Sequence, residues 1–349
     1  MGMTRSSRAT AALLLLGGLL SSRAQYPPCA TAFDCSLNGL CVAGACECDA
    51  PWVGASCETL QFAVSPASGK NLWTGNASLN TWSGPILRDP AGVFHFYVPV
   101  YEHASLWKVI FTAHGTAGAI EGPYNWSSRG NISATGLNPA GLVFPDPATG
   151  APVYSLWDQQ DILTSASADG PFVRSYKNPM PSSTAPCFSK GAFYLADQSM
   201  RRVLTTRALD EPWTVFSNIT LPHLTYAVED SFLWVDPRGN FHIINHAYST
   251  AEKTSCGSSH VSSHSFSENG TVWGRSDQPY GHTVHFDDGS SHTYATLERP
   301  YLNFDAAGRI THLHVAADLV TGDEGCAPTP CVNCKYVDHA GTVLIKLGA

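Results

Sequence analysis

The sequence predicts an all-β fold, a five-bladed β-propeller that follows a small disulfide-rich N-terminal module. Two observations predict the propeller: five apolar hairpin units recur along the chain, each with a turn glycine, and a third strand-sized segment follows four of them. No segment has the pattern of a convincing amphipathic helix. The module is predicted by six of the 11 cysteines, which fall between Cys29 and Cys57.

Each hairpin unit begins with a proline or an acidic residue, continues as an apolar strand, turns at a glycine and returns as a second strand. The five units span 83–97, 138–158, 185–197, 226–248 and 298–314, and the third strands span 110–114, 162–167, 203–207 and 262–267. The turn glycines lie about 40 to 70 residues apart, which suits blades of about 50 residues with variable loops. A β-sandwich with extra strands is the alternative, because it also combines short strands with regular turns.

The N-terminus has the features of a secretory signal peptide, which we expect to span residues 1–24. Arg5 and Arg8 precede the apolar run 11–20, and small residues at 22 and 24 suit cleavage. The run is too short to cross a bilayer, which takes about 20 apolar residues. Glycosylation sequons agree with secretion; their asparagines are Asn76, Asn125, Asn131, Asn218 and Asn269. We expect an extracellular protein without a membrane anchor.

The charge balance argues against two classes of partner. The net charge is -8, charged residues make up 14% of the chain, and no basic cluster is present. Nucleic acids and anionic membranes both require a footprint of Lys and Arg, so we expect neither as a partner. The sequence also lacks the Gly-x-Ser-x-Gly, phosphate-loop and dinucleotide motifs, and we expect no cofactor.

The cysteine cluster predicts a disulfide module at residues 25–59. So short a segment cannot bury a sufficient core, and disulfides must stabilise it. Six cysteines allow many pairings by count alone. The spacing, the Cys46-x-Cys48 pair and the aromatic-x-Gly before Cys57 closely resemble an epidermal growth factor-like domain. The resemblance implies the pairs Cys29–Cys41, Cys35–Cys46 and Cys48–Cys57.

The same module offers no sign of a calcium site. The calcium-binding subtype places acidic ligands just before its first cysteine, where this chain has residues 25–28 without a carboxylate. Two interpretations of the module stay open: it contacts a protein partner, or it is a spacer or N-terminal cap of the propeller. We expect the propeller to span residues 60–349.

The candidate site of the propeller lies where its innermost strands begin. In a propeller these strands meet at one mouth of the central channel. Aligning the five units brings the following residues to that mouth: Ser83-Gly84, Asn138, Ala185, Glu229-Asp230 and Glu298-Arg299. Acids and a cation from distant parts of the chain therefore gather in one place.

Several stretches of the fourth and fifth units resemble the five-bladed propeller glycosidases of glycoside hydrolase family 43. The matching stretches are 228–234, 239–242, 264–267 with Gly270 and Trp273, 297–300 and 304–305. The resemblance implies a catalytic base in blade one, a general acid in blade four and a third carboxylate that orients them. Glu229 matches the acid, and we expect burial to raise its pKa toward the working pH.

Two of the three carboxylates implied by the resemblance are absent. Blade one has Ser83-Gly84-Pro85 and blade three has Ala185-Pro186-Cys187 at those positions. Glu298 or Asp230 is the candidate replacement for the base. Alternation along a strand would send Glu229 and Asp230 to opposite sides, so that at most one of them enters the channel.

Six residues are candidates for substrate binding because of their place or their chemistry: Arg299, Asn138, His264, Trp157, Asp158 and His114. Arg299 offers a planar fork of donors to a uronate or sulfate, or it neutralises Glu298 and Asp230 as a buried ion pair; we favour the ion pair. Trp157 has a ring that suits a sugar face, with the polar Asp158 beside it.

The remaining histidines and cysteines predict no metal site. His95 and His242 hold equivalent places in blades one and four, and we interpret them as inter-strand hydrogen-bonding residues. His242 and His246 have a zinc spacing only if they lie on a helix. The five later cysteines are expected to form disulfides, with one thiol left buried or bonded between chains: Cys187, Cys256, Cys326, Cys331 and Cys334.

These observations lead to a functional hypothesis with two rivals. We expect a secreted carbohydrate-active protein that binds a polysaccharide or other glycan at the channel mouth and cleaves it as a glycoside hydrolase. Glu229 would donate the proton, and Glu298 or Asp230 would activate water. The first rival is a non-catalytic glycan-binding or adhesion protein that has lost its acids. The second is a protein that docks a partner through the N-terminal module.

Overall fold

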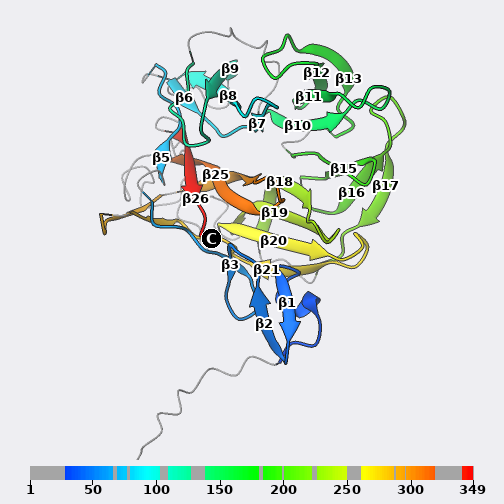
Figure 1. The fold of residues 1–349 in the computed structure, drawn as a ribbon, viewed down its shortest axis with the longest axis vertical. Helices are drawn as coiled ribbons and strands as arrows, with labels where there is room; N and C mark the ends of the chain where they lie inside the picture. Colours follow the sequence, from blue (N-terminus) through cyan, green and yellow to red (C-terminus); the bar gives the residue numbers. More distant parts are fainter. Residues whose placement is uncertain are drawn as a thin grey trace, which may run out of the picture.

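The computed structural model describes residues 28–65, 69–76, 79–102, 109–126, 138–180, 184–198, 200–221, 226–249, 261–286, 288–294, 296–318 and 340–348. Its regular structure is all β apart from one 3-10 turn, η1 (Ala32–Cys35). Five four-stranded sheets are arranged around one axis, as Figure 1 shows. The prediction of a five-bladed β-propeller is confirmed.

Blades two, three and four are simple antiparallel meanders, in which each strand pairs with the next in the chain. Blade two comprises β10 (Ala140–Pro145), β11 (Pro152–Trp157), β12 (Asp161–Ser165) and β13 (Val173–Lys177). Blade three comprises β14 (Cys187–Ser189), β15 (Ala192–Ala196), β16 (Arg202–Thr206) and β17 (Thr214–Asn218). Blade four comprises β18 (Tyr226–Val235), β19 (Phe241–Ser249), β20 (Ser262–Ser267) and β21 (Gly274–Asp277).

Blade one has an innermost edge made of two short strands. β7 (Ile86–Arg88) pairs with the first half of β8 (Phe94–Glu102), and β6 (Leu79–Thr81) pairs with its second half. β9 (Val109–Ala117) completes the pairing on the outer side of β8. The interruption between β6 and β7 falls at residues 82–85, next to the channel.

Blade five is closed by a strand from the start of the propeller. Its order is β24 (Leu297–Phe304), β25 (Ile310–Asp318), β26 (Ala340–Lys346) and β5 (Lys70–Asn71). β5 pairs with β26 antiparallel, so the two ends of the propeller lie in one sheet. A two-stranded hairpin, β22 (Thr283–His285) and β23 (Ser291–Thr293), lies in the chain between blades four and five.

A repeated aspartate turn explains why the first hairpins of blades one, four and five form where the sequence predicts. Asp89, Asp236 and Asp305 each accept a backbone N–H from the residue four positions later, at 2.8, 2.7 and 2.9 Å. The glycine three positions after each aspartate has a positive φ of 88°, 91° or 77°. Such a left-handed turn position favours glycine, which has no Cβ to clash.

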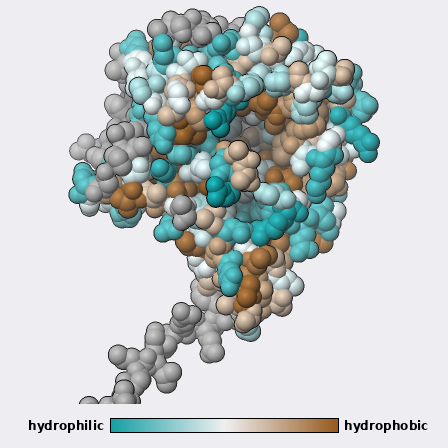
Figure 2. All heavy atoms as spheres, in the orientation of Figure 1, coloured by the Kyte–Doolittle hydropathy of each residue, from teal (hydrophilic) through white to brown (hydrophobic). Residues whose placement is uncertain are grey.

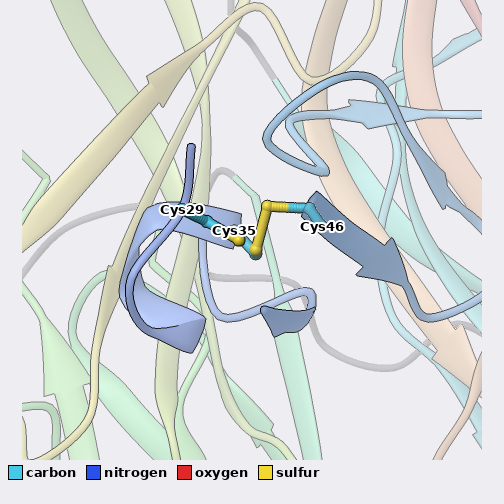
Figure 3. A group of neighbouring side chains, drawn as sticks. All are labelled: Cys29, Cys35 and Cys46. Carbon is cyan, nitrogen blue, oxygen red and sulfur yellow. A yellow bond between two sulfur atoms is a disulfide. The ribbon is translucent and has the colours of Figure 1, made fainter. Parts of the chain in front are cut away.

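The cysteine-rich region is held by three disulfides. Cys29 pairs with Cys41, Cys35 with Cys46 and Cys48 with Cys57, which confirms the pairing implied by the resemblance. Figure 3 shows the Cys35–Cys46 bond beside Cys29. The region adds two small hairpins: β1 (Gly39–Val42) with β2 (Ala45–Cys48), and β3 (Trp52–Val53) with β4 (Thr59–Leu60).

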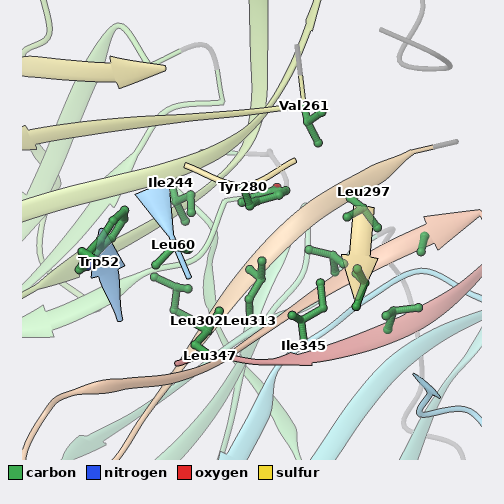
Figure 4. Packing of buried hydrophobic residues seen from close by; sticks show 14 of the residues in the cluster. Trp52, Leu60, Ile244, Val261, Tyr280, Leu297, Leu302, Leu313, Ile345 and Leu347 are labelled. Atoms are coloured by element: carbon green, nitrogen blue, oxygen red, sulfur yellow. The ribbon is translucent and has the colours of Figure 1, made fainter. Parts of the chain in front are cut away.

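This region packs on the outer strands of blade four. Phe33 contacts Phe266 with ring centroids 5.0 Å apart, and Trp52 stacks on His264 at 5.0 Å. Arg238, in the aspartate turn of blade four, donates to the carbonyl of Leu37 at 2.8 Å. Trp52 and Leu60 also belong to a large buried cluster with side chains of blades four and five, such as Ile244 and Leu313 (Figure 4). The cysteine-rich region therefore shares a core with the propeller.

The outer face of the cysteine-rich region carries exposed apolar side chains. Leu40, Val42 and Val53 are exposed, and Figure 2 shows brown hydrophobic atoms at this end of the molecule. Scattered exposed apolar residues are ordinary on protein surfaces, so this face alone does not favour the partner-docking interpretation.

Several predictions concern residues that the structure does not describe. The signal peptide lies outside the described residues, as do Cys256, Cys326, Cys331 and Cys334. Cys187 is a free thiol. Burial raises its pKa to about 12, so it is not a reactive nucleophile at neutral pH. Among the described residues, no helix has the length and apolar character needed to span a membrane.

Candidate active site

The innermost strands of all five blades line one axial cavity of about 230 Å³. Each blade contributes residues just downstream of the predicted mouth: Pro85, Gly141, Pro186, Phe232 and Tyr301. The segments that the sequence analysis aligned are therefore neighbours around a single axis, although they are scattered along the chain.

Four non-glycine residues at the starts of these strands have left-handed backbones. Their φ values are 33° for Ser83, 62° for Asn138, 53° for Asp230 and 51° for Arg299. Each such residue costs on the order of 1–3 kcal/mol, and a cluster of them is typical of a functional site. The pairing of β18 with β19 shifts register between Glu229 and Phe232, and that of β24 with β25 shifts between Glu298 and Tyr301.

The bulge in β18 brings two acids together. Oxygen atoms of Glu229 and Asp230 and a ring nitrogen of His246 all lie within 4.8 Å of one another. This corrects the expectation that strand alternation separates the two acids, because a bulge with a left-handed residue breaks the alternation. We call Glu229, Asp230, His246, Glu298 and Arg299 the acidic centre.

His246 lies between two carboxylates of the acidic centre. Its Nδ1 is 3.4 Å from Glu229 Oε1, and its Nε2 is 3.9 Å from Glu298 Oε1. Burial disfavours the charged ring, but the Glu298 and Glu229 carboxylates outweigh burial and hold the pKa of His246 above its ordinary value. His246 therefore bridges the acids of blades four and five.

Glu229 is the most exposed carboxylate of the acidic centre, with 32% of its side chain accessible. The Gln198 amide donates to its Oε2 at 3.3 Å. Burial favours the neutral acid, but His246 and the Gln198 amide outweigh burial, so the pKa of Glu229 is lowered. This corrects the expected rise of its pKa, because the sequence analysis did not place a cation beside it.

Asp230 has the opposite protonation behaviour. Asp230 is buried, and burial raises its pKa to about 7. The Arg299 guanidinium opposes this rise, and the negative charge of Glu229 adds to it. Arg299 Nη1 lies 3.6 Å from Asp230 Oδ1. Neighbouring residues of one strand therefore present an ionised and a partly protonated carboxyl near pH 7.

Arg299 reaches across the axis from blade five to blade two. Its Nη2 donates to the carbonyl of Pro139 at 2.7 Å and to the Tyr301 hydroxyl at 2.9 Å, and Tyr301 itself donates to Pro139 at 2.9 Å. Only 1% of Arg299 is exposed. This placement agrees with the favoured interpretation of Arg299 as a buried ion-pair partner rather than a surface clamp for substrate.

Unsatisfied polar atoms lie close to the acidic centre. Among the described residues, the hydroxyls of Tyr101 and Tyr280 and Nε of Arg299 are buried without a hydrogen-bond partner. Burial raises the pKa of both tyrosines. Tyr101 also interacts with the charges of Arg299 and Asp230, and Tyr280 with those of Glu298 and Asp230, so both tyrosines lie beside the acidic centre. Buried donors of this kind normally find a partner, such as water or a ligand hydroxyl.

Two predicted substrate residues lie in blade two, in structural roles. Trp157 is buried; its Nε1–H donates to Ser155 Oγ at 2.9 Å, and its ring meets Trp213 edge to face at 6.0 Å. Asp158 accepts the backbone N–H groups of Gln160 and Asp161 at 2.7 and 2.6 Å, which caps a turn. The burial of Trp157 corrects its expected role in a sugar subsite. Asn138 is half-buried beside Pro139, at the axis.

The other two predicted substrate residues, His114 and His264, are buried in equivalent histidine pairs. His95 Nδ1 lies 3.0 Å from His114 Nε2, and His242 Nδ1 lies 3.1 Å from His264 Nε2. The rings of each pair are stacked. The structure therefore confirms that His95 and His242 form hydrogen bonds between strands. It corrects the expectation that their partners, His114 and His264, line a substrate cleft.

Two residues at the site were not predicted there: His246, which was considered only as a zinc ligand, and Gln198. His246 faces Glu229 in the β18–β19 register, so folding the hairpin about its aspartate turn would have brought the two near each other. Gln198 lies in the connection that follows β15, and no periodic pattern marked it.

No family model matches the chain, and no curated protein matches its sequence. An α-L-arabinofuranosidase from Podospora anserina, solved with cellotriose, superposes with a TM-score of 0.51 and 11% identity over 84% of this chain and 98% of that one. The fold is that of propeller glycoside hydrolases.

Two further solved structures have the same fold. A family 117 glycoside hydrolase from the marine bacterium Zobellia galactanivorans has a TM-score of 0.50 and 8% identity over 83% of this chain and 91% of its own. A protein described as a glycoside hydrolase has a TM-score of 0.51 and 8% identity, covering 82% and 92%. Identities this low establish the shared fold and leave the activity to be argued from the site.

Proposed function

We propose that the protein is a secreted carbohydrate-active protein that binds a glycan at the acidic centre and hydrolyses a glycosidic bond there. One observation carries the proposal: adjacent carboxyls, Glu229 and Asp230, have pKa values shifted in opposite directions at the channel of a propeller shared with glycoside hydrolases. Glycoside hydrolysis requires one protonated and one ionised carboxyl at neutral pH.

The directions of the two pKa shifts exchange the catalytic roles that the sequence predicted for Glu229 and Asp230. Asp230 is partly protonated near pH 7, so it is the candidate general acid. Oxygens of Glu229 and Asp230 lie within 4.8 Å of each other, which is nearer the short separation of a retaining pair, so the ionised Glu229 is the candidate nucleophile. The 32% exposure of the Glu229 side chain leaves it open to a water or a sugar hydroxyl. Glu298, on the other side of His246, adds negative charge that favours a positively charged transition state.

Glycan binding without hydrolysis is a second candidate, favoured by a specific observation. Blades one, two and three bring Ser83, Asn138 and Ala185 toward this end of the axis, and none of these residues carries a carboxylate. All the acids of the centre thus come from blades four and five. A protein that only binds glycan would use the accessible carboxylate of Glu229 as a hydrogen-bonding partner.

Glu229→Gln is expected to lower the rate of product formation by about 10²- to 10⁴-fold, because an amide cannot act as the nucleophile. The assay incubates the protein with a panel of plant and algal polysaccharides and measures released sugars. Binding to the same glycans is measured in parallel on an array.

Glu211→Gln is the matched control, since Glu211 is exposed on the outer turn of blade three, and its rate should equal that of the wild type. Equal product from wild type and Glu229→Gln would exclude Glu229 from the mechanism. Binding by the wild type without any product would decide for the second candidate.

A further inference from the structure

A second cluster of titratable side chains lies where blade one meets blade two, outside the acidic centre. It consists of His95 on β8, His114 on β9 and Asp169 in the turn between β12 and β13. His95 and His114 are each 2% exposed, whereas 35% of the Asp169 side chain is exposed. The proposed function does not use this cluster.

Two of the three distances between the candidate ligand atoms are close to those of a tetrahedral site. His95 Nδ1 is 3.0 Å from His114 Nε2 and 3.5 Å from Asp169 Oδ1, and all three atoms lie within 4.8 Å of one another. Ligands about 2.0–2.1 Å from a tetrahedral Zn²⁺ lie about 3.3 Å apart, so only a small adjustment would let all three bind one ion. We propose that His95, His114 and Asp169 form a zinc site that joins blade one to blade two.

The surroundings of His95 support this assignment. Its other ring nitrogen, Nε2, lies 3.4 Å from Asp89 Oδ2. Metal-binding histidines usually donate that second N–H to a carboxylate or carbonyl, which orients the ring. His114 is oriented by Tyr97, whose ring stacks on it with centroids 4.6 Å apart and planes 6° apart. Both imidazoles are therefore held in place before any ion binds.

Blade four contains an internal comparison that singles out Asp169. It repeats the aspartate and both histidines: Asp236 Oδ2 lies 3.5 Å from His242 Nε2, and His242 pairs with His264. Ser276 is added there at a different place: its hydroxyl lies 3.1 Å from His264 Nδ1, whereas Asp169 lies beside Nδ1 of the first histidine, His95. An aspartate–histidine–histidine ladder thus forms without a third ligand, and the carboxylate of Asp169 is what turns the ladder of blade one into a ligand set.

The chemistry of the set favours Zn²⁺ over Ca²⁺ and Mg²⁺. Two imidazoles and one carboxylate suit zinc, whereas the other two ions prefer an all-oxygen environment. The exposed side of Asp169 leaves the fourth position to water. Because the ligands come from two blades, bound zinc would stabilise the contact between them, and zinc would bind the folded state in preference to the unfolded one.

The test uses the full mature protein, stripped with a chelator and titrated with Zn²⁺ and, separately, with Co²⁺. We expect one high-affinity equivalent, a rise in Tm on adding zinc, and the visible absorption of tetrahedral cobalt. Asp169→Asn should lower zinc affinity by at least about 100-fold, since ligand loss exceeds the 10- to 100-fold cost of losing an outer partner. Asp89→Asn, which removes the outer partner of His95, should lower zinc affinity by only about 10- to 100-fold.

Two control variants locate the ion. Asp236→Asn removes the equivalent aspartate of blade four and should leave zinc binding unchanged. Glu229→Gln tests the acidic centre, which also groups two acids and a histidine. The proposal is overturned if the stripped wild type binds no zinc, if Asp169→Asn binds it as tightly as the wild type, or if Glu229→Gln abolishes binding. The metal-free Tm of Asp169→Asn should match that of the metal-free wild type, which excludes misfolding.

Discussion

Arg299→Met is expected to lower the free energy of unfolding by about 3–5 kcal/mol at pH 8, where Asp230 is mostly ionised and would be left as a buried charge without its partner. The methionine would fill much of the same volume, but Asp230 would lose its cation at 3.6 Å and the Pro139 carbonyl would lose one of its two donors. Backbone strain does not enter the comparison, because both side chains carry a Cβ at the φ of 51°.

The measurement is reversible denaturant unfolding of the wild type, Arg299→Met, Asp230→Asn and the double variant. The double variant should recover part of the loss, because Asp230→Asn removes the carboxylate that Arg299→Met leaves unpaired. Arg299→Lys should fall between wild type and methionine, since an ammonium keeps the charge without the planar fork. A change below about 1 kcal/mol in Arg299→Met would show that the ion pair is not buried as described.

The blade architecture could be predicted because its signals are local. Turn glycines with positive φ, such as Gly92, Gly239 and Gly308, follow aspartates that cap the same turns, and both residues are visible in the sequence. Aligning these turns placed Pro85 and Pro186 around one axis. The closing pair of β5 with β26 could not be predicted, because it joins a two-residue strand to a segment far along the chain.

The details of the acidic centre depend on a backbone feature that has no sequence marker. The bulges after Glu229 and Glu298 place a left-handed backbone at Asp230 and Arg299, where glycine would ordinarily be expected. Strict alternation therefore put the acids on opposite sides. His246 lowers the pKa of Glu229, and recognising this required the hairpin register as well as the composition.

Aromatic and imidazole side chains were the least predictable, because the same residue types serve packing and binding. Trp157 and His264 were candidates for a glycan cleft, yet both are buried, and the latter lies between Trp52 and Trp234. Their sequence neighbours gave no information about the cysteine-rich region that covers His264. The Gly-x-Phe-His sequence that follows the turn in blades one and four was the better guide, since its repetition indicated a structural role for His95 and His242.

Asp230→Asn tests the proposed proton donor in two independent ways. If Asp230 is the general acid, the variant should lose about 10²- to 10⁴-fold in rate, because an amide cannot donate the proton. The wild-type rate should fall about tenfold per pH unit above the pKa of about 7, as the donor becomes ionised. A wild-type rate that stays constant from pH 7 to pH 9 would contradict this role.

The second readout is stability and does not depend on any glycan. Burial, opposed by Arg299, raises the folded-state pKa of Asp230 from 3.8 to about 7, so between these values the folded state binds more protons than the unfolded state. The contribution of Asp230 is fully present below about pH 4 and is lost as the pH rises toward about 7. The Asp230→Asn variant does not lose this contribution. The difference in free energy of unfolding, variant minus wild type, should therefore increase by about 2–3 kcal/mol from pH 5 to pH 8. A pH-independent difference would mean that Asp230 is already ionised at pH 5, and Arg299 would then outweigh burial in setting its charge.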